Sequence, residues 1–87
     1  MRKMSDFKVG EVTHYYDKLG VAVIELSADL AIGDEIRISG HGNEFTQEVK
    51  SMQVEHKNIK KAEKGQAIGL KVEQPVKDGD EVYKISP

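Results

Sequence analysis

The feature of this sequence that most constrains its fold is a succession of short β-branched runs separated by turns that contain glycine. Six such runs can be drawn within 87 residues, and helical periodicity is nearly absent. Short strands at this spacing are typical of a small all-β domain. The expected strands run from Phe7 to Tyr16, Val21 to Leu26, Glu35 to Ser39, Phe45 to His56, Ala67 to Val72 and Glu81 to Ile85.

The second and third runs differ in how their apolar residues are arranged. Residues 21–26 are apolar on both faces, which predicts a strand that is covered on two sides. In the third run Ile36 and Ile38 share one face while Arg37 takes the other, as in a half-solvated antiparallel strand. The third strand is therefore expected to place its isoleucines in the core.

The fourth run is too long for one flat strand and changes phase. Phe45 and Val49 lie on one parity, whereas Met52 and Val54 lie on the other. The change predicts a β-bulge near Lys50–Ser51. Because such kinks let a small sheet curl and close, the expected architecture is a closed six-stranded barrel.

The connections also carry information. Gly33 and Gly79 each precede an aspartate and a strand, where a tight turn needs a positive φ. The stretch from Asn58 to Lys64 lacks β character and is expected to be a long loop, with one helical turn at residues 62–64. The expected core consists of Val12, Val23, Ile24, Ile36, Ile38, Val49, Met52, Val54, Ile68, Leu70, Val72 and Val82.

Length and composition bound the organisation of the chain. One domain is expected over residues 7–87, behind a flexible amino-terminal arm of residues 1–6. The formal net charge of -2 gives no general attraction to nucleic acid or membrane, so any such binding must be local. The absence of cysteine excludes disulfides and thiolate chemistry, and no apolar stretch is long enough for a membrane span. A cytoplasmic location is therefore expected.

Several segments, taken in order, resemble the second domain of translational GTPases such as elongation factor Tu. The resemblance covers nearly the whole chain and is carried by Val9–Val12, Gly20–Val23, Ile32–Ile38, Val49–Gln53, Ala62–Leu70 and Asp78–Val82. It implies a closed six-stranded Greek-key barrel. In elongation factor Tu this barrel packs on the GTPase domain and helps to hold the aminoacyl end of transfer RNA. Here no Gly-x-x-x-x-Gly-Lys-Ser/Thr phosphate loop exists, so GTP binding by this chain is not expected.

A second resemblance is to the small barrel at the carboxy terminus of collagenase-like peptidase relatives, some of which act in RNA hydroxylation. It implies the same kind of small barrel. Fold likeness alone does not give a function, which has to be inferred from particular residues.

Two clusters are candidate binding residues. The first is a basic run made of His56 and the four lysines of the next eight residues, which are Lys57, Lys60, Lys61 and Lys64. It could meet RNA phosphates, with release of counterions; the alternative is a solvated loop interrupted by Glu63. The second is His14, Tyr15 and Tyr16, where a tyrosine could stack on an exposed base; the alternative is that strand alternation buries one tyrosine as core.

Metal binding and catalysis are not expected. Three histidines with nearby carboxylates lack any ligand spacing such as His-x-x-x-His; these residues are His14, His41, His56, Asp17, Glu44 and Glu55. No nucleophile elbow or paired-acid arrangement is present, and a barrel this small offers little concave volume. We therefore expect no cofactor and no enzyme activity.

The sequence thus predicts a non-catalytic binding module. Its expected partner is RNA, such as transfer or ribosomal RNA, or a protein of the translation or RNA-modification machinery. The alternative is a protein-interaction subunit that supplies its barrel to a separately encoded collagenase-like peptidase or another partner.

Overall fold

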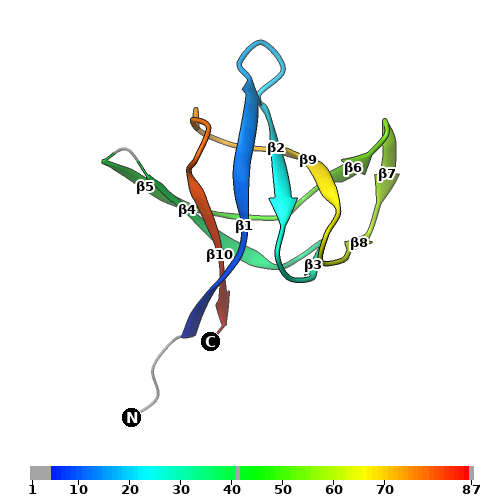
Figure 1. Cartoon of the computed structure of the whole chain (residues 1–87), viewed down its shortest axis with the longest axis horizontal. Helices are drawn as coiled ribbons and strands as arrows, with labels where there is room; N and C mark the ends of the chain where they lie inside the picture. The colour runs from blue at the N-terminus through cyan, green and yellow to red at the C-terminus, as the bar shows by residue number, and fades with distance from the viewer. Residues whose placement is uncertain (1–4, 41, 87) are drawn as a thin grey trace.

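The computed structural model describes residues 5–40 and 42–86, which form β-strands joined by turns and contain no helix (Figure 1). The strands are β1 (Ser5–Tyr16), β2 (Val21–Leu26), β3 (Leu30–Ala31), β4 (Glu35–Gly40), β5 (Asn43–Glu48), β6 (Met52–Val54), β7 (Lys57–Ile59), β8 (Lys61–Ala62), β9 (Ala67–Lys71) and β10 (Glu81–Ser86). Eight of them form an antiparallel sheet in the order β5-β4-β10-β1-β2-β9-β6-β7, and β3 pairs with β8. No helix in the described residues could span a membrane.

The long strand β1 lies at the centre of the sheet and has two shifts of register against its neighbouring strands. Its register shifts between Lys8 and Gly10 against β10, and between Val12 and His14 against β2. Extra residues of this kind bend a strand and increase its twist. The sheet therefore curls, and its concave face encloses one core.

The core contains most of the expected residues. It is formed by Val9, Val12, Ala22, Ile24, Leu26, Leu30, Ile36, Ile38, Phe45, Val49, Met52, Ala62, Ile68, Leu70, Val72, Val76 and Val82. Of the twelve residues expected there, Val54 is only partly buried and packs against the core, and Val23 lies on the opposite face of the sheet.

The all-β class is confirmed, but the sheet is not closed into the expected six-stranded barrel. Its edge strands β5 and β7 lie at opposite sides of the molecule, and within residues 5–40 and 42–86 no ladder joins them (Figure 1). The buried side chain of Gln47 spans part of the opening. Its Nε2 donates to the Lys71 carbonyl oxygen at 2.9 Å, and its Oε1 accepts from the Glu73 amide at 2.8 Å. A side-chain amide thus replaces a strand ladder between β5 and the end of β9.

Two expectations about strand boundaries are corrected. The fourth run is not one bulged strand, because the chain leaves strand geometry at residues 49–51 and changes partner, from β4 to β9. The expected loop and helical turn at residues 58–64 instead include β7 and β8. These strands take their register from their partners: Ile59 lies opposite Met52, and Ala62 lies opposite Leu30.

The glycine turns form as expected, and each is closed by the aspartate that follows. Gly33 and Gly79 have φ values of 95° and 91°. The carboxylate of Asp34 accepts from the Ala31 amide at 2.9 Å, and that of Asp80 accepts from the Lys77 amide at 3.0 Å. Residues 33–35 and 79–81 share the sequence Gly-Asp-Glu, and in both places it forms the same kind of turn.

Candidate functional site

A row of aligned residues crosses the convex face of the sheet. Going from strand to strand, His14 lies opposite Val23, Val23 opposite Gly69, Gly69 opposite Gln53, and Gln53 opposite Asn58. Because Gly69 has no side chain, the centre of the row is lower than its flanks. The glycine thus leaves a hollow in the middle of the convex face of the sheet.

An apolar ledge borders this hollow at the β1–β2 turn. The side chains of Tyr16 and Leu19 are 48% and 62% exposed. The imidazole of His14 meets the Tyr16 ring edge-on, with ring centroids 4.4 Å apart. The turn itself is held because the Leu19 and Gly20 amides both donate to the Tyr16 carbonyl, at 3.1 and 2.9 Å. A large aromatic surface is therefore presented to solvent on a fixed support.

The opposite rim is the β6–β7 hairpin, whose two turn residues have unusual backbone geometry. Glu55 and His56 have φ values of 52° and 66°, so both lie in the left-handed region without being glycine. Two consecutive positive φ values define the type I′ turn that suits the twist of a hairpin, but Asn-Gly is its preferred sequence. This turn therefore carries backbone strain at the position where it presents His56.

Together these elements enclose a groove of about 450 Å³, which we call the outer-face groove. It is lined by Tyr16, Leu19, Val21, Val23, Gln53, Glu55, His56, Ala67, Ile68 and Gly69. Its floor and one wall are apolar, whereas an amide, a carboxylate and an imidazole lie on the hairpin side. Such a groove is chemically suited to a flat ring or an apolar side chain that also carries polar edges.

The structure brings part of the first candidate cluster and part of the second together. Tyr16 and His56, which are 40 positions apart in the sequence, both line the outer-face groove, and His14 contacts Tyr16. Tyr15 points to the other face, where it is partly buried against the core. Strand alternation thus leaves one of the two adjacent tyrosines exposed and packs the other against the core.

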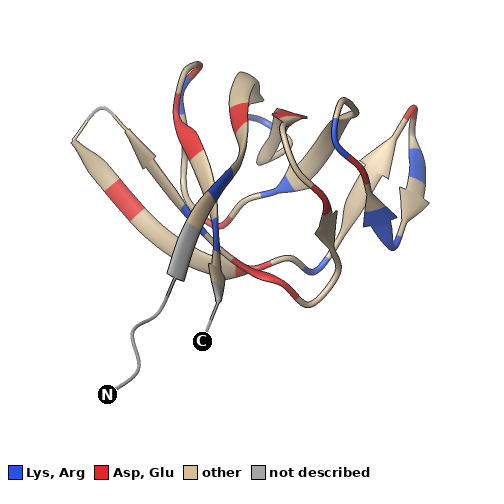
Figure 2. Cartoon of the chain, turned by 60° about the horizontal axis from the view of Figure 1, so that its bottom comes forward, with Lys and Arg blue, Asp and Glu red and all other residues tan. Residues whose placement is uncertain are grey.

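The four lysines of the basic run lie outside the outer-face groove. All are exposed, and Figure 2 shows their blue segments at the end of the molecule formed by β7 and β8. Within the described chain none of them forms an ion pair with a carboxylate. The members of this group are Lys57, Lys60, Lys61 and Lys64.

Of the ten residues that line the outer-face groove, only Tyr16 and His56 were named from the sequence as candidate binding residues. Val21 and Val23 were expected on a second buried face of their strand, and Leu19, Gln53 and Gly69 were not expected in a site. The signal for the groove is the apolar character of β2 on both faces in a chain too small to cover both. That pattern is as consistent with an exposed binding face as with a two-sided core.

The described part of the chain contains no cluster of three potential metal ligands among histidine, aspartate and glutamate. His41, one of the histidines considered for a metal site, lies outside the described residues.

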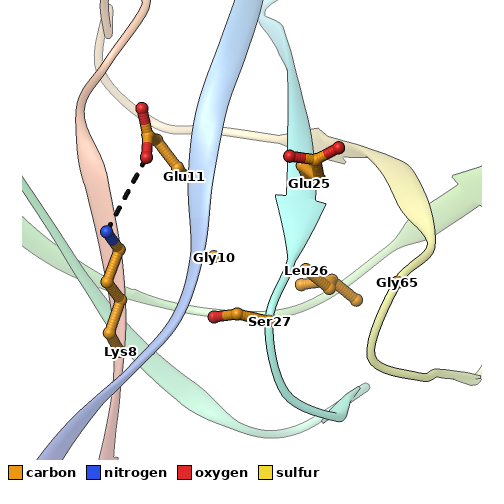
Figure 3. Close-up of a pocket in the computed structure, with 7 residues that line it drawn as sticks. All are labelled: Lys8, Gly10, Glu11, Glu25, Leu26, Ser27 and Gly65. Atoms are coloured by element: carbon orange, nitrogen blue, oxygen red, sulfur yellow. Dashed lines mark ion pairs between the residues drawn. The ribbon is translucent and has the colours of Figure 1, made fainter.

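A second hollow, of about 340 Å³, lies where β1 passes β2 (Figure 3). It is lined by Gly10, and by Glu11 on β1 and Glu25 on β2, which are directly opposite each other in register. Glu11 is also opposite Glu81 of β10. Lys8 offsets the repulsion among these carboxylates, with its Nζ 3.7 Å from Glu11 and 3.3 Å from Glu81.

This charge arrangement is linked to Tyr83, whose hydroxyl donates to Glu81 at 2.8 Å. That hydrogen bond, followed by the contact with Lys8, lowers the pKa of the Glu81 carboxyl. The same bond raises the pKa of the Tyr83 hydroxyl, and the hydrogen bond to Glu81 raises the pKa of Lys8. The Arg37 guanidinium lies 5.1 Å from the centre of the Tyr83 ring. The groups compensate one another and form a structural network.

The fold matches the C-terminal domain of a longer protein of known structure. A crystal structure of the C-terminal domain of a Geobacillus thermoleovorans protein described as a U32 peptidase superposes with a TM-score of 0.84, covering 88% of this chain and 90% of that domain. The sequence identity is 24%, so this likeness establishes the fold alone.

Longer proteins contain a more similar sequence. The chain is 44% identical over 84 residues to an uncharacterized protease of Methanocaldococcus jannaschii, and 38% identical over 79 residues to a collagenase of Porphyromonas gingivalis. These alignments cover 95% and 88% of this chain, but only 21% and 22% of those proteins. The chain thus spans about a fifth of the length of the curated relatives it matches. No family model matches the sequence.

Proposed function

We propose that this chain is a non-catalytic accessory domain that docks on RNA through the outer-face groove, as a part of the translation or RNA-modification machinery. The observation that carries the proposal is the groove itself. The strained turn at Glu55 and His56 lies on one side of Gly69, and the exposed side chains of Tyr16 and Leu19 lie on the other. The accessory role is supported by the correspondence of the chain to about a fifth of longer proteases.

The chemistry of the groove suits an unstacked base. A base can stack on the ring of Tyr16, and stacking on aromatic side chains tolerates any sequence. Gln53, Glu55 and His56 can hydrogen-bond to the edges of the base. The exposed lysines at the adjacent end of the molecule would meet the negatively charged backbone of the strand. The resemblance to the second domain of elongation factor Tu, which helps to hold transfer RNA, stays a prediction from the sequence and would agree with this role.

Fluorescence anisotropy with a labelled single-stranded RNA oligonucleotide tests this proposal. Removing the aromatic ring under one stacked base costs about 1–3 kcal/mol, so Tyr16→Ala should weaken binding by roughly 5- to 150-fold. Phe7→Ala is the matched control, because Phe7 is also an exposed aromatic residue, 46% accessible, but lies outside the groove. Equal affinities of the wild type and Tyr16→Ala would reject RNA docking in the groove.

The alternative is that the groove binds a protein, namely a separately encoded collagenase-like peptidase or another partner. The observation that favours it is the exposure of Leu19, an aliphatic side chain of the kind that protein interfaces bury. On this alternative the lysines are passive and the apolar ledge inserts into the partner.

The two proposals differ in their response to ribonuclease and salt. A tagged form of the chain, purified from the native organism, should lose its partners on ribonuclease treatment if RNA is the ligand. A protein that stays bound after ribonuclease treatment in high salt, and no longer binds the Leu19→Ser variant, would favour the protein-binding alternative instead.

A further inference from the structure

A third hollow, separate from the outer-face groove, lies between the β6–β7 hairpin and the turn after β3. We call it the lysine hollow; its volume is about 310 Å³ and its wall includes Ile32, Lys50, Ser51, Asn58, Ile59 and Lys60. Of its lysines only Lys60 belongs to the basic run identified in the sequence. Lys50 also lines the lysine hollow. Residues 49–51 lie outside strand geometry between β5 and β6, and residues 50 and 51 line the hollow together with residue 60.

The backbone of the lysine hollow is fixed on both sides. The Ile32 amide donates to the Lys60 carbonyl at 2.9 Å, and the adjacent Gly33 amide donates to the Val49 carbonyl at 2.8 Å. Residues 52 and 59 are paired across the hairpin. The segments that carry Lys50 and Lys60 are therefore held at a set separation, and only their side chains need to order when a ligand binds.

The polar side chains on the wall are donors, and none is a carboxylate. Within the described chain neither Lys50 nor Lys60 pairs with a carboxylate. Ser51 contributes a hydroxyl. Asn58 uses its Oδ1 to accept from Gln53 at 3.0 Å, which leaves its NH₂ group as a donor. Two lysine side chains, a hydroxyl and an amide NH₂ thus border one hollow, and their donor groups match an oxyanion.

We propose that the lysine hollow is a phosphate-binding site. A phosphate group carries one negative charge as a diester and up to two as a monoester, and it offers several acceptor oxygens, so it can use two ammonium groups and neutral donors together. Lys57, Lys61 and Lys64 at the same end of the molecule raise the local positive potential, although the chain as a whole is acidic. The phosphate can come from an RNA backbone or from a free phosphorylated compound.

Titration with sodium tripolyphosphate at low ionic strength, followed by amide chemical shifts, tests the site directly. The double variant Lys50→Gln/Lys60→Gln should weaken tripolyphosphate binding at least tenfold. The control is Lys18→Gln/Lys77→Gln, which removes the same charge from exposed lysines outside the hollow and should bind like the wild type. Absence of tripolyphosphate binding, or equal weakening by both pairs, would overturn the proposal. Dispersed spectra of each variant show that it is folded, and Lys50→Arg/Lys60→Arg should retain binding.

A second titration, with single-stranded RNA, distinguishes the source of the phosphate. If the source is RNA, the Lys50/Lys60 variant weakens RNA binding and reduces the salt slope by about 0.7 for each phosphate that the protein no longer neutralises. Unchanged RNA affinity with loss of tripolyphosphate binding assigns the site to a free phosphorylated compound. Both outcomes are independent of the groove, because RNA docking there is judged by Tyr16→Ala.

Discussion

Gly10 and Gly69 both lie within strands, but the space beside their Cα atoms differs. A Cβ at position 10 would lie 2.7 Å from Ile24 Cγ2 and 2.8 Å from the Glu25 carbonyl oxygen. At position 69 the nearest atom would be Val21 Cγ1 at 3.4 Å, an ordinary contact distance. Gly10 is thus needed for strands β1 and β2 to approach, whereas Gly69 keeps the groove open.

These distances predict opposite effects of the same substitution. Gly10→Ala should lower the free energy of unfolding by about 1–3 kcal/mol, because backbone atoms cannot move away from the new methyl group. Gly69→Ala should leave it unchanged or raise it by up to about 1 kcal/mol, because alanine restricts the unfolded chain. Urea denaturation measures both variants. A loss of stability from Gly69→Ala as large as that from Gly10→Ala would show that Gly69 is needed for packing instead.

At the scale of elements, the β6–β7 hairpin is strained by its turn residues. Replacing Glu55-His56 by Asn-Gly should raise the free energy of unfolding by about 1 kcal/mol, because these residues favour the positive φ angles that the turn requires. Thermal and urea unfolding provide the measurement. Glu63→Asn, at another exposed position between strands, is the control and should change stability by less than about 0.5 kcal/mol. A destabilised Asn-Gly variant would mean that Glu55 or His56 makes a stabilising contact that outweighs the strain.

Gln47 has the complementary role of joining two elements that no ladder connects within the described residues. Gln47→Leu should cost about 2–4 kcal/mol, because it leaves the Lys71 carbonyl and the Glu73 amide without their partner. Gln74→Leu, at an exposed position in the same connection, should stay within about 0.5 kcal/mol of the wild type. A Gln47→Leu variant as stable as Gln74→Leu would show that these two hydrogen bonds do not stabilise the opening of the sheet.

Most strand positions could be predicted from the sequence, whereas the pairing of strands with one another could not. Alternation in the third run correctly placed Ile36 and Ile38 inward, and the glycine turns were located because positive φ has a local cause. The short strands β7 and β8 were missed because their register comes from Met52 and Leu30, which lie on other strands. The opening of the sheet that Gln47 spans was not predicted, because no local sequence pattern distinguishes a buried glutamine from an exposed one.

The candidate site was partly predictable. Tyr16 and His56 were named because aromatic and basic residues are common in binding sites, but nothing local shows that they share a groove. That proximity follows from the strand order β1-β2-β9-β6, which places them at the two sides of Gly69. Val23 was expected in the core because apolar residues on both faces of a strand usually indicate burial.

At the scale of the whole molecule, the carboxylates of β1, β2 and β10 form a row on the convex face that Lys8 and Tyr83 help to stabilise. The lowered pKa of Glu81 means that its contribution to stability is present above its unfolded pKa and is lost as the pH falls through the folded value. The pKa values of Tyr83 and Lys8 are raised in the folded state. Their contributions to stability are therefore present below about pH 10 and are lost as the pH rises through the folded pKa values.

Unfolding by urea as a function of pH tests this network. Wild-type stability should fall between neutral pH and about pH 3 more steeply than that of Glu81→Gln, because glutamine removes the titrating group. Tyr83→Phe should reduce the loss of stability above about pH 10. Parallel acid profiles of the wild type and Glu81→Gln would contradict a stabilising role for the Glu81 carboxylate.

Amide chemical-shift mapping with a single-stranded RNA oligonucleotide tests most directly whether the outer-face groove is a binding surface. We predict saturable shifts centred on Tyr16, Val23, Gln53, His56 and Gly69, with loss of these shifts in Gly69→Phe, where a ring fills the groove. Shifts confined to the opposite edge at β5, or none in the groove at saturating RNA, would contradict a binding role for the groove.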